Sequence, residues 1–218
     1  PTTEEALQFL LDPTKDKRSQ LIDQLLLDPR YARRMTEFFN VMLMERRGED
    51  PNWQTFLSTS FAANMPWDQM VRHMVSPDTN NETTRGSGYF ITKRLEKYGQ
   101  NPTDFPGLAR DLGRMFLGVD LACAQCHDHL FIDDYKQADF QGLFAFINNT
   151  YIRQDTDYPA IGMKPIKVKV EFNSVFEEGT FSTGPKLPGL DEIAVPEFVT
   201  GEEFAVPPNN DTKAPGIP

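Results

Sequence analysis

The 218-residue sequence has only two cysteines and three histidines, and it lacks any surplus of positive charge. Its formal net charge is −10 at pH 7, whereas nucleic-acid-binding proteins use an excess of Lys and Arg to neutralise phosphates. It also lacks a run of about 18 apolar residues, the length that a helix needs to span a bilayer. We therefore expect neither nucleic-acid binding nor a membrane span in this chain.

Recognisable catalytic motifs are missing as well. The sequence contains no nucleophile elbow, no phosphate-binding P-loop and no dinucleotide-binding glycine pattern. No signal peptide opens it, but because it begins at Pro1 without a methionine, this says little about the compartment. The sequence leaves open whether the protein is an enzyme, and it favours an electron-transfer or haem-binding domain over a stand-alone enzyme.

The first two thirds of the chain carry the signals of helices. Hydrophobic residues make up 39% of the sequence and charged residues 25%, as in ordinary globular domains. Thr2 and Glu5 form a capping-box pattern, and the Asp-Pro pairs at 28–29 and 50–51 place a capping carboxylate before a proline at the first helical position. Apolar residues then recur at three- and four-residue spacing. We expect helices after these three starts, and further helices over 66–75, 88–97, 104–117 and 135–149.

The pattern changes after residue 149. The segments 166–172 and 175–181 are rich in strand-forming residues on either side of Asn173-Ser174, which predicts a small β-hairpin. Closely spaced prolines from residue 185 onward disfavour continuous helix or strand. The sequence therefore predicts a mainly α fold with a small β-hairpin appendage and a Pro-rich C-terminal tail. Its expected parts are a helical domain over 1–150, a small β-rich extension over 151–200, and a Pro-rich linker or tail over 201–218.

Both cysteines and two of the three histidines fall within residues 123–129, which read CAQCHDH. Two cysteines separated by two residues can bond the vinyl groups of one haem, while a histidine directly after them ligates its iron. Cys123 and Cys126 fit the attachment role, and His127 fits the proximal ligand. A zinc site is the main alternative, with two histidines completing the pair of cysteines. A thioredoxin-like redox pair fits less well because the neighbourhood reads as helical.

The other two histidines and a methionine supply further candidates. His129 is too close along the chain to His127 to bind the opposite face of the same iron. A hydrogen bond to a haem propionate, a turn contact with a neighbouring aspartate, ligation of a haem in another molecule and a purely structural role are all open to it. Candidates for the distal iron position are His73 and Met115. That position can also be empty, which would favour binding of a small ligand over electron transfer alone.

Residues 116–149 read FLGVDLACAQCHDHLFIDDYKQADFQGLFAFINN. This stretch resembles the signature of the planctomycete-type cytochrome c-like domains, the larger of their two kinds, long filed as a domain of unknown function. Two upstream stretches, PTTEEALQFLLDPTKDKRSQLIDQLLLDPRYARRMTEFF and FAANMPWDQMVRHMV, are similar to the same family, so the resemblance spans roughly residues 1–150. It implies one covalent haem c in a domain of a larger exported protein, periplasmic or at the cell surface. Cys123 and Cys126 would be its thioether attachments and His127 its proximal ligand.

The sequence supports two candidate functions. The first is covalent c-type haem binding through CxxCH with electron transfer to an unknown redox partner protein, or small-ligand binding if the distal position is open. The second is a zinc-stabilised, non-catalytic interaction domain of a larger exported protein. The two differ in the metal that the cysteines hold, since haem c binds them covalently and zinc binds them as thiolates.

Overall fold

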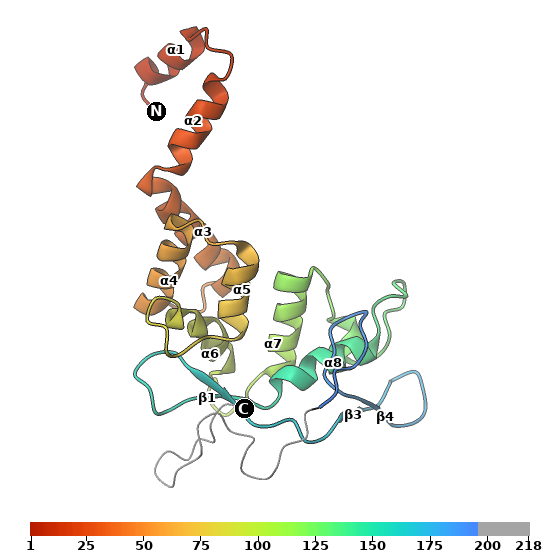
Figure 1. Cartoon of the computed structure of the whole chain (residues 1–218). Coiled ribbons are helices and arrows are strands. Elements are labelled where there is room, and N and C mark those ends of the chain that lie inside the picture. The colour runs from red at the N-terminus through yellow and green to blue at the C-terminus, as the bar shows by residue number, and fades with distance from the viewer. Residues whose placement is uncertain (196–218) are drawn as a thin grey trace.

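The computed structural model describes residues 1–195, and this part of the chain is mainly helical (Figure 1). The outer end of the predicted 151–200 extension and the whole predicted 201–218 tail lie outside the described residues. No helix within residues 1–195 is both long and apolar enough to cross a membrane. The α-helices of this part are α1 (Thr3–Leu11), α2 (Lys17–Leu26), α3 (Pro29–Met44), α4 (Pro51–Ala62), α5 (Trp67–Val75), α6 (Tyr89–Leu95), α7 (Phe105–Leu112) and α8 (Gln137–Ile147).

The predicted helix starts are confirmed, because each depends on hydrogen bonds between residues close in sequence. The Thr2 hydroxyl accepts a bond from the Glu5 N–H at 3.2 Å, and the Glu5 carboxylate accepts one from the Thr2 N–H at 2.6 Å. Asp50 caps α4 by accepting a bond from the Trp53 N–H at 2.9 Å. Asp28 caps α3 in the same way, with the Arg30 N–H at 2.8 Å. These side chains satisfy N–H groups that have no partner within the helix.

The cap of α3 gives a testable pH dependence. Hydrogen bonds from the Arg30 guanidinium and from the Arg30 N–H lower the pKa of Asp28 from 3.8 to about 2. A carboxyl whose pKa is lowered on folding contributes stability above its unfolded pKa, and this is lost as the pH falls through the folded value. We expect wild type to be more stable than Asp28→Asn near pH 6 and the two to converge as the pH approaches 2. Urea unfolding at a series of pH values measures this; a constant difference across the range would contradict it.

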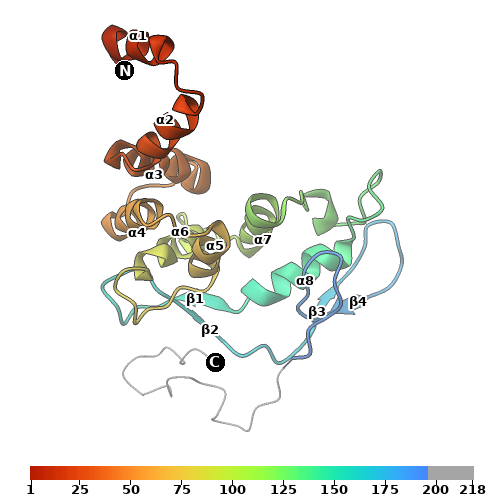
Figure 2. The ribbon, with the colours of Figure 1, turned by 45° about the horizontal axis from the view of Figure 1, so that its top comes forward.

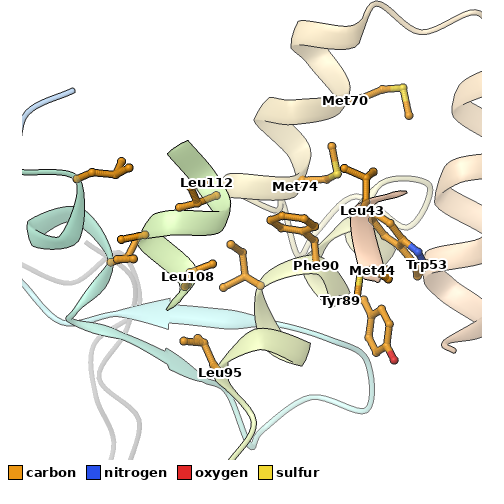
Figure 3. Close-up of a cluster of buried hydrophobic side chains, with 14 of the residues drawn as sticks. Leu43, Met44, Trp53, Met70, Met74, Tyr89, Phe90, Leu95, Leu108 and Leu112 are labelled. Carbon is orange, nitrogen blue, oxygen red and sulfur yellow. The ribbon is translucent and has the colours of Figure 1, made fainter. Parts of the chain in front are cut away.

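Helices α1 and α2 stand apart from the rest of the described structure and bury none of their residues (Figures 1 and 2). The core lies farther along the chain and is built from α3 to α8. Figure 3 shows part of it, with Phe90 of α6 close to Met74 of α5. The buried indole of Trp53 donates a hydrogen bond to the Asn40 amide oxygen at 2.8 Å, so its polar atom is satisfied.

A buried arginine joins three of these helices. Arg94 of α6 is only 4% exposed, and burial lowers its pKa while Asp111 of α7 opposes that effect. Its Nε lies 2.9 Å from the Asp111 carboxylate, and its Nη2 donates to the Leu43 carbonyl of α3 at 2.6 Å. The guanidinium also lies 4.0 Å from the centre of the Phe90 ring. The charge is thus paired and hydrogen-bonded, as a charge in a core must be.

The β structure contains the predicted hairpin and a second one. Two antiparallel pairs are present in the described residues, β1 (Thr150–Ile152) with β2 (Ile161–Met163) and β3 (Val170–Phe172) with β4 (Phe181–Thr183). The hairpin predicted around Asn173-Ser174 is confirmed as the pair of β3 and β4, but its strands are shorter than the segments 166–172 and 175–181, and the connection 173–180 joins them. Two backbone groups of that connection bond elsewhere: the Asn173 carbonyl to Gln137 and the Val175 N–H to Cys126. These distant contacts engage residues 173 and 175, so the connection between the two strands is longer than a two-residue turn.

The helix predicted over 104–117 is present in two parts. Regular α-helix ends at Leu112, and the chain continues as a π-helical turn η2 (Gly113–Leu117). Gly118 follows with φ of 70°, a left-handed conformation that favours glycine and ends the helical segment where the sequence predicted. The CAQCHDH motif begins five residues later, between η2 and α8 (Figure 1).

Candidate functional site

The two cysteines lie on one tight turn with their side chains toward solvent. A 3-10 turn, η3 (Cys123–Gln125), is closed by a hydrogen bond from the Cys126 N–H to the Cys123 carbonyl at 3.3 Å. Leu121 and Ala124 are completely buried, so they anchor the turn in the core. Both thiols are free and exposed. The turn therefore offers two accessible sulfurs three residues apart on a backbone that the core holds in place.

His127 is half-buried directly after the second cysteine. Its Nδ1 lies 2.6 Å from the Asp128 carbonyl oxygen. A carbonyl oxygen can only accept a hydrogen bond, so Nδ1 carries the proton and Nε2 keeps its lone pair. Histidines that ligate metals are commonly held in this way, with the second ring nitrogen bonded to a backbone carbonyl. The geometry leaves Nε2 of His127 available as a ligand.

Asp128 connects the motif to the following helix. Its carboxylate accepts a hydrogen bond from the Gln137 N–H at 2.8 Å, at the start of α8, and lies 3.1 Å from the Lys136 ammonium. Burial raises the pKa of this carboxyl, but the bonds from Gln137 and Lys136 outweigh burial and lower it below its ordinary value. The Gln137 side chain in turn donates to the Gln125 carbonyl at 3.4 Å. The aspartate of CHDH thus serves as a long-range helix cap.

His129 has a local role in the described structure. Its Nδ1 accepts hydrogen bonds from the N–H groups of Phe131 and Ile132, at 3.2 and 3.0 Å. Its own N–H donates to the Tyr135 carbonyl at 2.9 Å. The expected turn contact is therefore made with backbone amides and not with an aspartate, and it shapes the loop between the motif and α8. The protonated nitrogen of His129 is then Nε2, the opposite of His127.

The two candidates for the distal iron position are engaged elsewhere. His73 is half-buried on α5, with its ring 6.3 Å from the ring of Phe56 in an edge-to-face contact. The sulfur of Met115 lies 3.6 Å from Nη2 of Arg94. The His73 ring thus contacts α4, its carbonyl accepts a hydrogen bond from Ser87 of η1 (Arg85–Gly88), and the Met115 sulfur contacts α6.

The residues of the predicted zinc alternative do not converge. Within the part of the chain that the structure describes, no three side chains of His, Cys, Asp or Glu come together as a metal ion would need. A structural zinc site takes four such ligands in a tetrahedron. The cysteines and histidines would have to move toward one another to form one.

Exposed apolar side chains contact residues of the CAQCHDH motif. Phe131 is 88% exposed, and Val175 and Phe176 are 65% and 68% exposed. The Phe176 ring lies 4.8 Å from the His127 ring, and the Val175 N–H donates to the Cys126 carbonyl at 3.2 Å. Phe176 was not predicted as a site residue, because no local pattern links it to a motif some 50 positions earlier.

Comparison with known proteins gives one match. The family model described as PSCyt2, protein of unknown function (DUF1549), matches residues 1–151. No curated protein and no solved structure matches the chain. The matched segment contains the CAQCHDH turn and helices α1 to α8, and it ends within β1, so Val175 and Phe176 lie beyond it.

Proposed function

The chain belongs to the PSCyt2 family of proteins of unknown function, and we propose that it binds one haem c covalently, with Cys123 and Cys126 as attachments and His127 as proximal ligand. One observation carries the proposal: two free, exposed thiols stand on a single anchored turn, and the next residue is a histidine whose Nε2 is available. When bound, such a group supplies one-electron chemistry by cycling its iron between two oxidation states.

The protein's own residues provide attachment and orientation. Each thiol would hold the haem by adding its S–H across one vinyl double bond, with the sulfur on one carbon and the hydrogen on the other, so that no oxidant would be needed. Buried Leu121 and Ala124 hold the turn in place. The bond between Nδ1 of His127 and the Asp128 carbonyl fixes the direction in which Nε2 points.

The proposed role is electron transfer to a redox partner protein, with small-ligand binding as the second candidate. One observation favours the second: His73 packs against Phe56, and the Met115 sulfur contacts Arg94, so neither side chain is directed to the motif by its contacts. An iron without a sixth protein ligand can bind a small molecule. We further propose that the chain is part of a larger multidomain protein, exported to the periplasm or cell surface, where haem is attached to thiols.

The direct test is intact mass and a pyridine haemochrome spectrum. The full chain is produced in a periplasm together with a haem-attachment machinery, and cytoplasmic protein serves as the unloaded control. We expect the mass to rise by one haem and the spectrum to be that of two thioether bonds. A chain that carries no haem but one zinc would replace the proposal with a zinc-stabilised interaction domain.

Histidine variants then assign the iron ligands. His127→Ala is expected to keep covalent haem, because the thiols remain, but to change the absorption spectrum through loss of the proximal ligand. His73→Ala is expected to leave the spectrum of wild type unchanged, because its ring packs against Phe56. A loss of low-spin bands in His73→Ala would instead identify His73 as the distal ligand.

A further inference from the structure

A segment outside the family match lies across the CAQCHDH turn. The Asn173 carbonyl accepts a hydrogen bond from the Gln137 side chain at 3.0 Å, and the Val175 N–H donates to the Cys126 carbonyl at 3.2 Å. Gln137 is 4% exposed, so the first of these bonds is anchored in the core of the molecule. Residues 173–176 are thus attached at two points on either side of Ser174, to α8 through Asn173 and to the motif through Val175.

The second of these bonds brings Phe176 to His127. The two ring centres are 4.8 Å apart, and the ring planes are inclined by 53°. This separation lies within the range of favourable contacts between aromatic rings. The imidazole of His127 therefore makes two contacts: a hydrogen bond from Nδ1 to the Asp128 carbonyl, and a ring contact with Phe176.

We infer that Phe176 is a positioning residue for His127, and that residues 173–176 complete the haem site from outside the 1–151 segment. This rests on the proposed function. An imidazole with one hydrogen bond can still swing about that bond, whereas an aromatic ring packed against it removes this freedom and fixes the direction of Nε2. Phe176 also excludes water from one side of the ligand, which is one of the factors that set the redox potential of a bound haem.

Phe176 keeps a second surface for a bound group. The residue is 68% exposed although it contacts His127, and neighbouring Val175 is 65% exposed. Val175 is bonded through its backbone to Cys126, which carries one of the two free thiols. A flat apolar ring system held by those thiols would cover surface that is otherwise left in water, and burial of such surface is favourable.

The contact is first tested in the full chain without haem, by NMR of the histidine side chains. The sequence has three histidines, so their ring signals can be assigned by single substitutions. We expect Phe176→Ala to move the ring signals of His127 and not those of His129, because it removes the ring current of a neighbouring aromatic. Phe131→Ala is the matched control: the Phe131 ring lies 6.4 Å from the His129 ring, so this variant should move His129 and not His127.

Amide hydrogen exchange measures whether Phe176 holds the segment in place. Exchange of the Val175 N–H is expected to be about tenfold faster in Phe176→Ala than in wild type, the change that an aromatic contact of this strength produces. Phe176→Tyr keeps an aromatic ring and should restore the wild-type exchange rate and the wild-type His127 signals.

The haem-loaded protein tests the role in the site. Phe176→Ala is expected to lower the midpoint potential, because water beside the ligand stabilises the more highly charged ferric state. Phe176→Tyr and Phe131→Ala should leave the potential close to that of wild type. A purely structural role would change stability without this pattern.

The outcomes separate the two proposals. If His127 signals do not respond to Phe176→Ala, the positioning role is overturned whatever the haem content. If they respond but the midpoint potential of the loaded protein does not, the contact has no role in the site and the inference is again overturned. If the signals respond and no variant, wild type included, takes up haem, the contact is real and the proposed function has failed.

Discussion

Replacing Cys123 and Cys126 together by alanine is expected to abolish covalent haem attachment, so that the intact mass equals that of the bare polypeptide. The chain has no other cysteine, so no substitute thiol is available. Both side chains are exposed and free, and their loss removes neither a disulfide nor core packing. The fold should therefore be retained, and circular dichroism of the variant should match that of the unloaded wild type.

Single variants serve as the control for this loss. Cys123→Ala and Cys126→Ala each leave one thiol on the same turn, so each can retain one thioether bond and part of the haem. Mass spectrometry and haem staining after denaturing electrophoresis measure the bound fraction. Haem that stays covalently attached in the double variant would refute the role of these cysteines.

Asp111→Ala is expected to lower the free energy of unfolding by about 3–5 kcal/mol, the cost of leaving a buried charge without its partner. Asp111 lies 2.9 Å from Nε of Arg94, whose side chain is 2% exposed. Without this carboxylate the guanidinium stays in the core among the carbonyls of Leu43 and Phe90 and the sulfur of Met44. Urea unfolding of the variant and of wild type measures the difference.

Glu45 provides a matched comparison. It also pairs with Arg47 and Arg114, as Asp111 does, but it is 37% exposed and does not contact Arg94 through any described ion pair. Glu45→Ala should cost no more than about 1 kcal/mol, as is usual for surface ion pairs. The double variant Arg94→Met with Asp111→Ala should recover much of the stability, because an apolar side chain needs no charge partner. If Asp111→Ala and Glu45→Ala lowered the free energy of unfolding equally, this would contradict the claim that Asp111 stabilises the fold by pairing with the buried charge of Arg94.

The sequence by itself determined the mainly helical fold, the helix starts and the position of the candidate site. Thr2, Asp28 and Asp50 each cap a helix through a bond to an N–H two or three residues away, so the pattern of neighbours contains all the information that is needed. Cys123, Cys126 and His127 lie within five positions of one another, so one turn is enough to bring them together.

Only the tertiary structure decided which distant residues meet the site and which do not. Asn173 and Val175, in the connection between β3 and β4, bond to Gln137 and Cys126, and Phe176 thereby reaches His127. The sulfur of Met115, a distal candidate by sequence, contacts Arg94. Such contacts depend on how whole helices and loops pack, and the local spacing of residues in the sequence does not predict that packing. Local hydrogen bonds are encoded locally, whereas the surroundings of His127 are a property of the assembled fold.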